Sequence, residues 1–347
     1  MNPPVLVSYA VTRKCNLRCV HCYSEAVEKP HPNELTTEEA RELISDIARL
    51  GARMLIFDGG EPTLREDLPL LVKHAYDEGL SPLLGTNGMI DTLTKSYLRR
   101  LKEAGLKAIA ISLDGAKPET HDEFRGVRGA WKKTIKGIQN CREVGIPFQI
   151  GVAVHKKNIH EFPEIVDLAK KLGANAVEVF DFVTTGRGRL YKEYELTVDQ
   201  KKWLVNYIIK RQLVEEDIYF RVIALPQYWV EVEKNVKDED MLVRFVRTCC
   251  AVGYRYVTIL YDGTVYPCML LQIPLGNIRE KPLSEIWEKS ELLKNLRDRN
   301  NLKDRCRICK YKDICMGARC RAFARTGDPF AEDPACWLVG GQEDATR

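Results

Sequence analysis

Short runs rich in β-branched residues alternate with longer amphipathic segments between Val5 and about Phe182. This alternation is typical of parallel strands that are connected by helices. Because such crossovers are right-handed, six units in a row predict an α/β fold, a partial (β/α)6 barrel of the TIM type with the carboxyl ends of its strands on one rim. The expected strands are VLVSYAVT, RMLIFDGG, SPLLGTNG, KAIAISLDG, FQIGVAV and AVEVFDFV.

Helices fit between these strands. Thr36 has the side chain of an N-cap, and a glycine follows each of five helical segments, as at many helix C-termini. The segments are 37–50, 67–78, 94–104, 130–144 and 160–172, and the glycines are Gly51, Gly79, Gly105, Gly145 and Gly173. A further helix is expected at about 197–216.

The chain has 347 residues, more than a single core usually includes. Charged, less patterned sequence at 231–244 separates the barrel from a cysteine-rich tail. We therefore expect a barrel domain at 1–235, with the helix at 197–216 as a bridge. A small cysteine-rich domain is expected at 236–347.

The 53 basic and 49 acidic residues leave a net charge of +4, which argues against a nucleic-acid partner. No apolar run reaches the roughly 20 residues of a membrane span, and no basic-then-apolar leader precedes the first strand. We therefore expect a cytoplasmic protein without a membrane partner. One segment, 285–325, holds twelve Lys or Arg against six Asp or Glu. It is either an ordinary solvated face or a surface that attracts an anionic substrate or an acidic electron donor.

Three cysteines, Cys15, Cys19 and Cys22, form a CxxxCxxC arrangement directly after the first expected strand. Three thiolates at this spacing are able to hold three irons of a cubane cluster and to leave the fourth iron open to a substrate or cofactor. Zinc is the alternative, but a structural zinc site takes four ligands and His21 is the sole local candidate for the fourth.

The second expected strand ends in Gly59, Gly60, Glu61 and Pro62. Two glycines allow a ligand to approach the backbone closely, and the Glu61 carboxylate is able to accept hydrogen bonds from an ammonium group. By itself, GGEP is equally compatible with a plain turn.

Twelve cysteines in a chain without a secretion signal favour metal ligation over disulfides. Cys141 stands apart in an expected helix and is interpreted as a small buried hydrophobe. A zinc ribbon is the alternative to iron–sulfur clusters in the tail. The tail cysteines are Cys249, Cys250, Cys268, Cys306, Cys309, Cys315, Cys320 and Cys336.

CxxxCxxC after the first strand and GGEP after the second resemble the radical S-adenosylmethionine (SAM) enzymes, and the resemblance covers almost the whole chain. It implies that Cys15, Cys19 and Cys22 bind a [4Fe-4S] cluster whose open iron takes the amino and carboxylate groups of SAM. The other residues that it implies are Gly59, Gly60 and Glu61 at the methionine end of SAM, and His21 and Tyr23 near the adenine.

Two further rim loops carry short polar side chains. Asn87 lies at the end of the third expected strand and Ser112 at the end of the fourth, where such groups suit hydrogen bonds to a ribose or carboxylate, and Ser112 is favoured for the ribose. Asp114 either joins them or caps the following turn. By the resemblance, Arg125 meets the SAM carboxylate, and an ordinary surface arginine is the alternative.

The tail resembles the SPASM extension of radical SAM enzymes, which carries auxiliary iron–sulfur clusters. Four residues separate Cys315 from Cys320, where that family usually has three. The resemblance implies one or two auxiliary [4Fe-4S] clusters, and with them an exit for an electron and a ferredoxin- or flavodoxin-type electron donor. The implied ligands are Cys250, Cys268 and Cys320 for the first cluster, with Cys249 as a fourth candidate, and Cys306, Cys309, Cys315 and Cys336 for the second.

Several segments resemble radical enzymes of the siroheme-dependent heme pathway, nearest to the heme b synthases. They include HDEFRGVRGAW, GIQNCREVGIPFQI, FVTTGRGR and CRAFARTGDPFAEDPAC. That family converts two propionates of iron-coproporphyrin III to vinyl groups by oxidative decarboxylation, so the resemblance implies oxidative C–H chemistry on a tetrapyrrole. Arg187 and Arg189, after the sixth strand, are candidates to clamp propionate carboxylates, with SAM or a surface carboxylate as alternatives.

Other functions stay open at this point. A peptide maturase of the same superfamily, which forms thioether or carbon–carbon crosslinks, is the first alternative. A relative that modifies a tungsten-enzyme cofactor is the second. A non-catalytic electron carrier or zinc scaffold is the third, and GGEP beside an open-site cluster motif counts against it.

Overall fold

The computed structural model describes residues 2–247 and 250–338. One ten-stranded sheet runs through it in the order β10-β9-β8-β1-β2-β3-β4-β5-β6-β7. The strands from β8 through β1 to β7 are parallel, and β9 and β10 add antiparallel pairs at the β8 edge. Their bounds are β1 Leu6–Thr12, β2 Met54–Gly59, β3 Ser81–Thr86, β4 Ala108–Ser112, β5 Phe148–Val154, β6 Ala176–Asp181, β7 Tyr219–Ile223, β8 Tyr256–Ile259, β9 Thr264–Tyr266 and β10 Gly276–Asn277.

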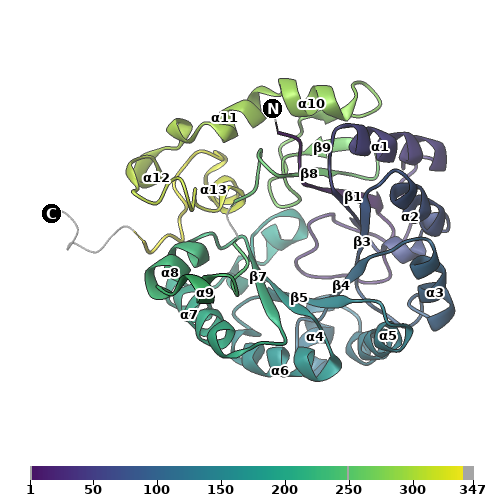
Figure 1. The fold of residues 1–347 in the computed structure, drawn as a ribbon, viewed down its shortest axis with the longest axis horizontal. Coiled ribbons are helices and arrows are strands. Elements are labelled where there is room, and N and C mark those ends of the chain that lie inside the picture. Colours follow the sequence, from purple (N-terminus) through teal and green to yellow (C-terminus); the bar gives the residue numbers. More distant parts are fainter. Residues whose placement is uncertain (1, 248–249, 339–347) are drawn as a thin grey trace, which may run out of the picture.

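Figure 1 shows the strands curved into an open ring with helices around its outside. This arrangement confirms the predicted partial barrel with a further C-terminal region. The helices are α1 Thr37–Arg49, α2 Leu68–Asp77, α3 Lys95–Glu103, α4 Pro118–Arg125, α5 Ala130–Val144, α6 Phe162–Leu172, α7 Val198–Val214, α8 Gln227–Asn235, α9 Glu239–Leu242, α10 Leu283–Lys289, α11 Glu291–Arg297, α12 Asp304–Ile308 and α13 Arg319–Thr326. Short 3-10 helices lie at η1 Pro62–Leu64, η2 Ile159–Glu161, η3 Gly186–Leu190, η4 Lys192–Tyr194 and η5 Arg299–Asn301.

The two faces of each barrel strand differ in burial. In β2, Leu55 and Phe57 are fully buried in the layer between sheet and helices, whereas Ile56 and Asp58 are partly exposed on the inner face of the ring. We call the space inside the ring the lumen. The main core is therefore the outer layer, and the lumen keeps room for bound molecules.

The expected helices form within about two residues of their predicted bounds, which is the usual uncertainty of helix ends. α1 begins at Thr36 with a complete capping box, in which the Glu39 side chain accepts from the Thr36 backbone N–H. The elements that were not predicted include α4 and β7 of the barrel. α4 is short and mostly charged, and β7 adds a seventh parallel strand whose first residue, Tyr219, is exposed.

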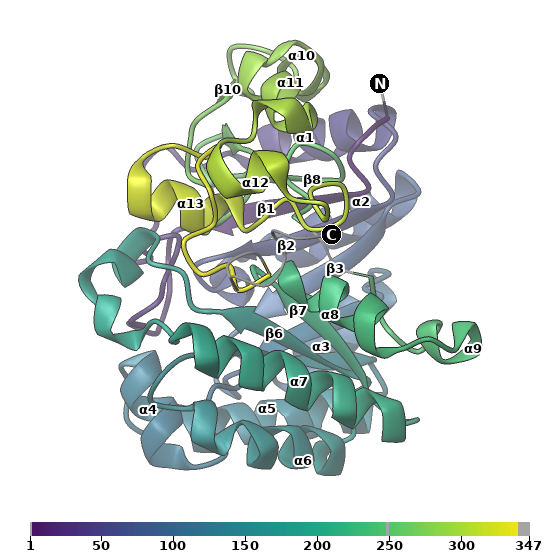
Figure 2. The same ribbon diagram turned by 90° about the vertical axis from the view of Figure 1, so that its left-hand side faces the viewer.

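The tail joins the barrel through the same sheet, because β8 pairs in parallel with β1 and places Tyr256 opposite Leu6. Figure 2 shows α13 and the rest of the tail on the same side of the molecule as β6 and β7. Arg321 of α13 contacts Asp181, the last residue of β6. The division near residue 235 stays a prediction, and α8 ends at that point. Within the described residues, no helix is long and apolar enough to cross a bilayer.

Candidate functional site

The three N-terminal cysteines lie in the loop between β1 and α1. Cys15 and Cys19 are buried, and Cys22 is partly exposed. The N–H of Leu17 lies 3.4 Å from Cys15 Sγ, and that of Ala26 lies 3.3 Å from Cys22 Sγ. Burial raises the pKa of the Cys15 thiol to about 12, so a bound cation is needed to keep this sulfur as a thiolate. Buried thiols that already accept N–H groups suit iron–sulfur ligation.

The cysteine loop is fixed by residues far away in the sequence. The N–H of Arg18 donates to the Arg125 carbonyl and that of Val20 to the Phe124 carbonyl, both at the end of α4. Arg187 donates from Nη1 to the Cys19 carbonyl, over 2.8 Å, and from Nη2 to the Ala26 carbonyl, over 2.7 Å. This use of its guanidinium counts against the prediction that Arg187 clamps a substrate carboxylate. Its neighbour Arg189 is exposed and pairs with Glu25 over 3.2 Å.

The absence of a side chain at Gly59 and Gly60 allows other backbone segments of this chain to approach them closely. A Cβ on Gly60 would lie 2.2 Å from the Lys14 carbonyl oxygen, and one on Gly59 would lie 2.7 Å from that of Thr12. The N–H of Gly60 donates to the Thr12 oxygen over 2.7 Å. The two glycines thus allow the end of β2 to pack against the start of the cysteine loop. The sequence had suggested that a ligand occupies this space.

Glu61 is fully buried, and its carboxylate accepts hydrogen bonds from the protein. Thr86 Oγ1 and the Asn87 N–H each donate to it over 2.8 Å, and Thr63 donates from both its N–H and its hydroxyl. Asn87 in turn donates to Asn16 of the cysteine loop, over 2.7 Å. Glu61 therefore holds the loops after β2 and β3 in place, and this role competes with the predicted contact to an ammonium group.

Arg125 is buried between Asp114 and the second cysteine. Its Nε lies 2.5 Å from Asp114 Oδ2, and its Nη1 lies 3.7 Å from Cys19 Sγ. Asp114 also accepts from the Ala153 N–H, so it joins β4 to β5 instead of capping a turn. Arg125 is thus an internal cation beside Cys19, and the alternative of a surface arginine is wrong. Ser112 ends β4 on the partly exposed lumen face.

His21 and Tyr23 leave the cysteine loop in different directions. His21 stacks on Phe124, with ring centroids 4.3 Å apart, and Phe124 also contacts His155. Burial lowers the pKa of His21 well below its ordinary value, which keeps the ring neutral. Tyr23 donates from its hydroxyl to Asp58 Oδ2, over 2.7 Å, at the mouth of the lumen. The sequence resemblance implied that both rings lie near the adenine of SAM. In the structure the two rings contact different residues, Phe124 and Asp58.

The tail cysteines form two groups. Four of them, Cys306, Cys309, Cys315 and Cys336, line one cavity. The sulfurs of three accept hydrogen bonds, from the Tyr311 and Gly317 N–H groups and from Arg319 Nη2 to Cys306 Sγ, over 3.5 Å.

The second group contains Cys250, Cys268 and Cys320. The pKa of Cys320 is raised first by burial and then by Cys268 and Cys250, so the three lie close together. Cys249 lies outside the described residues. Cys141 is fully buried in α5, as expected for a core residue. Among the described residues, the tail cysteines therefore form one set of four and one set of three, with the same members as the two sets implied by the sequence resemblance.

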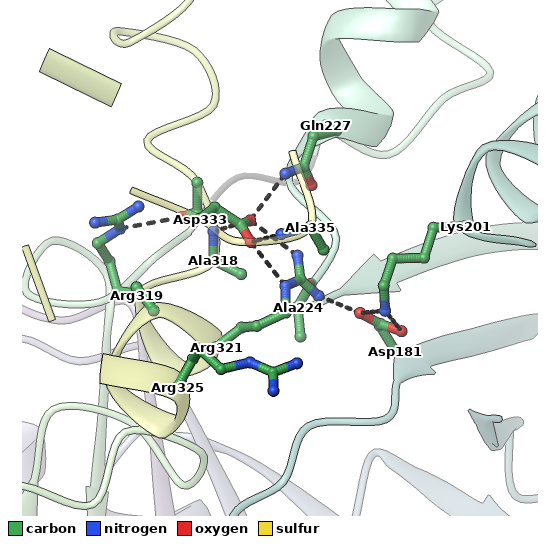
Figure 3. Close-up of polar contacts among 12 residues, drawn as sticks. Asp181, Lys201, Ala224, Gln227, Ala318, Arg319, Arg321, Arg325, Asp333 and Ala335 are labelled. Carbon is green, nitrogen blue, oxygen red and sulfur yellow. Dashed lines mark hydrogen bonds and ion pairs between the residues drawn. The ribbon is translucent and has the colours of Figure 1, made fainter. Parts of the chain in front are cut away.

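A buried chain of charges, which the sequence did not reveal, joins the tail to the barrel. Arg321 forms a two-point ion pair with Asp333, over 2.8 and 2.9 Å, and also binds Asp181 at the end of β6. Lys201 of α7 lies 2.6 Å from both Asp181 oxygens. Figure 3 shows Arg321 between the two carboxylates. The sole signal in the sequence was position, since Arg321 directly follows Cys320.

A second missed group is polar and lies in the lumen. Gln149 Nε2 donates to Glu178 Oε2 over 2.8 Å, and Arg221 Nη1 lies 3.7 Å from Glu178 Oε1. These residues come from β5, β6 and β7, and Arg221 stands opposite Glu178 in the sheet register. Glu178, a charge inside the apolar strand AVEVFD, was the sequence signal that could have indicated it.

Comparison with known proteins agrees with this arrangement. Residues 9–169 match the Radical SAM superfamily, and residues 249–310 match the SPASM iron–sulfur cluster-binding domain. The chain is 38% identical over 350 residues to the AdoMet-dependent heme synthase of Methanosarcina barkeri, with 99% of each chain covered. It is 34% identical to the Fe-coproporphyrin III synthase of the same organism, with 97% of this chain and 88% of that protein covered. SuiB of Streptococcus suis shares the fold with a TM-score of 0.75 at 18% identity, covering 97% of this chain and 77% of SuiB.

Proposed function

The chain belongs to the radical SAM superfamily and carries its SPASM domain, and on this premise we propose that it oxidatively decarboxylates the propionates of iron-coproporphyrin III. The observation that carries the proposal is the likeness to an AdoMet-dependent heme synthase over 99% of both chains. Likeness of this extent includes the cysteine loop, the lumen and both groups of tail cysteines, and does not stop at the shared barrel.

The residues present fit the groups that this chemistry needs. Cys15, Cys19 and Cys22 would hold the radical SAM cluster, since all three lie in one loop and their sulfurs already have polar hydrogens nearby. The two tail groups, with Cys249 as a further candidate, would hold one or two auxiliary clusters. When bound, the first cluster and SAM supply a 5'-deoxyadenosyl radical that removes a hydrogen atom from an unactivated carbon.

For SAM itself we assign the residues around the cysteine loop. Ser112 on the lumen face of β4 is positioned for the ribose, and His21, stacked on Phe124, provides a flat apolar wall for the adenine. The remaining assignments are the Gly59, Gly60 and Glu61 backbone for the methionine end, Arg125 for the carboxylate, and Tyr23 and Asn87 as supports of the surrounding loops.

The lumen provides a cation for a substrate carboxylate. Arg221 projects from β7, and its side chain is 38% exposed. Its contacts to Gln149 and Glu178, at 3.4 and 3.7 Å, involve Nη1 alone. These contacts orient the guanidinium of Arg221 and leave its other N–H groups free to bind a propionate. We place the carboxylate at Arg221, and Arg189 at the rim stays a second candidate.

The balance of the reaction requires an electron exit. Each propionate loses one hydrogen atom to the 5'-deoxyadenosyl radical, its bond to the carboxylate breaks to release carbon dioxide, and one electron must leave as the vinyl group forms. The tail cysteines offer the place for that electron, because a cluster held there accepts one electron without a proton.

Deuterium transfer tests the proposal. Iron-coproporphyrin III deuterated at the propionate β-carbons is incubated anaerobically with reconstituted protein, SAM and dithionite. The proposal predicts deuterium in the 5'-deoxyadenosine. Unlabelled 5'-deoxyadenosine formed at the same rate with and without porphyrin would contradict it.

A further inference from the structure

A large cavity lies at the end of the barrel opposite to the cysteine loop. It has a volume of about 680 Å³ and is bounded by the chain just before β1, the start of β2, the start of β8 and the end of α11. The N-terminal segment lies beside α10 in Figure 1, and Trp287 Nε1 donates to the Asn2 carbonyl over 3.2 Å. Because the cysteine loop follows the carboxyl end of β1, this cavity belongs to the amino ends of the strands.

The lining is strongly basic. Four arginines, Arg53, Arg255, Arg297 and Arg299, contribute to it, and no described Asp or Glu does. Arg53 and Arg255 are exposed, and within residues 2–247 and 250–338 neither forms an ion pair. Concave surfaces with charge of one sign concentrate ions of the opposite sign. The cavity is therefore suited to an anionic group.

Arg297 is held rigidly at the wall of this cavity. Its Nε donates to the Gly253 carbonyl over 2.5 Å and its Nη2 to the Trp287 carbonyl over 3.0 Å, with the guanidinium 4.6 Å from the Trp287 ring centre. Its Nη1 is buried and has no hydrogen-bond partner among the described residues. No ion pair among the described residues neutralises Arg297, so its charge adds to the positive field of the cavity.

The cavity adjoins the first group of tail cysteines. Cys250 is part of its lining. The pKa of Tyr256 is raised first by burial and then by Cys268, so Cys268 lies near this residue, which pairs with Leu6 in the sheet. Through Cys250, the group therefore borders the arginine-lined cavity.

We propose that this cavity receives acidic side chains of an electron-carrier protein, which takes the electron from the auxiliary cluster at Cys250, Cys268 and Cys320. The inference rests on the proposed function for the origin of that electron. The step moves one electron from the reduced cluster to the oxidised carrier, with no bond formed or broken and no proton transferred. The basic segment 285–325, which includes Arg297 and Arg299, extends the positive surface and steers such a partner.

The test compares two double variants with the same change in net charge. R53E/R255E reverses charge at the cavity, and R41E/R99E reverses it at exposed positions of α1 and α3. Each reconstituted protein is titrated with an acidic, oxidised [4Fe-4S] ferredoxin at low and at moderate salt. Stopped-flow mixing of the same oxidised ferredoxin with protein that has been reduced by dithionite and then freed of excess dithionite measures the rate of electron transfer.

We expect R53E/R255E to weaken ferredoxin binding and slow electron transfer by about tenfold or more at low salt, with a smaller salt dependence, and R41E/R99E to stay within about twofold of the parent. Both double variants should still form 5'-deoxyadenosine with dithionite, which shows that they fold. If R53E/R255E loses this activity, the neutral variant R53Q/R255Q is tested in its place. Equal binding by the two double variants would overturn the proposal. The binding and electron-transfer measurements contain no porphyrin. Their outcome is therefore independent of whether the protein decarboxylates iron-coproporphyrin III.

Discussion

The guanidinium of Arg187 donates a hydrogen bond to the carbonyl oxygen of Cys19 over 2.8 Å, across 168 positions of the chain. A second bond, to the Ala26 carbonyl, makes this side chain a clamp on the cysteine loop from the η3 turn. The cysteine loop therefore depends on the loop after β6 for its shape, in addition to its own sequence.

Replacing Arg187 should damage the N-terminal cluster site. R187A removes two hydrogen bonds from a charged donor, which together stabilise the loop by about 3 kcal/mol. We expect lower iron content and loss of the spectroscopic signal of the SAM-binding cluster. R189A, which removes an exposed neighbour, is the matched control and should change neither quantity. Normal iron content in R187A would refute the clamp.

Gly60 should not tolerate a side chain. In G60A the new Cβ would lie 2.2 Å from the Lys14 carbonyl, so β2 and the cysteine loop must separate. We expect an unfolding midpoint in urea lowered by the equivalent of about 2–3 kcal/mol and weak SAM binding. A Cβ added at Gly151 would meet its nearest non-neighbouring atom at 3.9 Å, and G151A should be nearly neutral in stability. Similar stability losses in both variants would show that the close approach is not the cause.

The buried charge chain gives a third prediction. R321A leaves Asp333 and Asp181 buried without their shared cation, which typically costs about 3–5 kcal/mol. R325A removes an exposed arginine of the same helix and should cost less than about 1 kcal/mol. Urea unfolding measures both. Equal losses would contradict the assignment of Arg321 as the link between barrel and tail.

Cysteine substitution separates ligands from core residues. C309S should remove iron and the signal of one auxiliary cluster, because Cys309 lines the four-cysteine cavity. C141S changes a buried cysteine of α5 and should leave the iron count unaltered. Iron analysis and electron paramagnetic resonance of both proteins make the comparison. An unchanged iron count in C309S would exclude Cys309 as a ligand.

The ion pair between Glu39 and Arg279 predicts a pH dependence. The Arg279 hydrogen bond lowers the pKa of Glu39 to about 2 in the folded protein, below its unfolded value of about 4.3. A carboxyl with a depressed folded pKa stabilises the fold above the unfolded pKa, and this contribution is lost as pH falls towards the folded value. E39Q keeps the capping box but removes the charge.

E39Q should therefore be less stable than the parent by about 0.5–1 kcal/mol at pH 7, with the difference shrinking below about pH 4.3. Urea midpoints of both proteins at pH 7, 5 and 4 provide the measurement. A difference that grows on acidification would have the wrong sign for this account.

Sequence reasoning identified those elements whose signals are local. The N-cap residue Thr36 and the glycines after helices indicated α1 and its neighbours, and CxxxCxxC placed three candidate ligands in one loop. It missed β7, because the five residues YFRVI do not alternate between polar and apolar side chains in the sequence. A short strand at the open edge of a barrel acquires its identity from pairing with β6.

Partners far apart in the chain were also beyond the sequence. Arg321 and Asp181 are separated by 140 positions, and nothing in either segment indicates which of many carboxylates an arginine will meet. The same limit explains Arg187, whose position after β6 suggested substrate, while its side chain binds the cysteine loop.

The most direct measurement of the central claim is mass spectrometry of the porphyrin after anaerobic incubation with reconstituted protein, SAM and a reductant. Our account predicts that iron-coproporphyrin III loses one carbon dioxide and two hydrogens for each propionate converted, first to a monovinyl and then to a divinyl product. Intact porphyrin beside continuing SAM cleavage by a protein with all its clusters would contradict it.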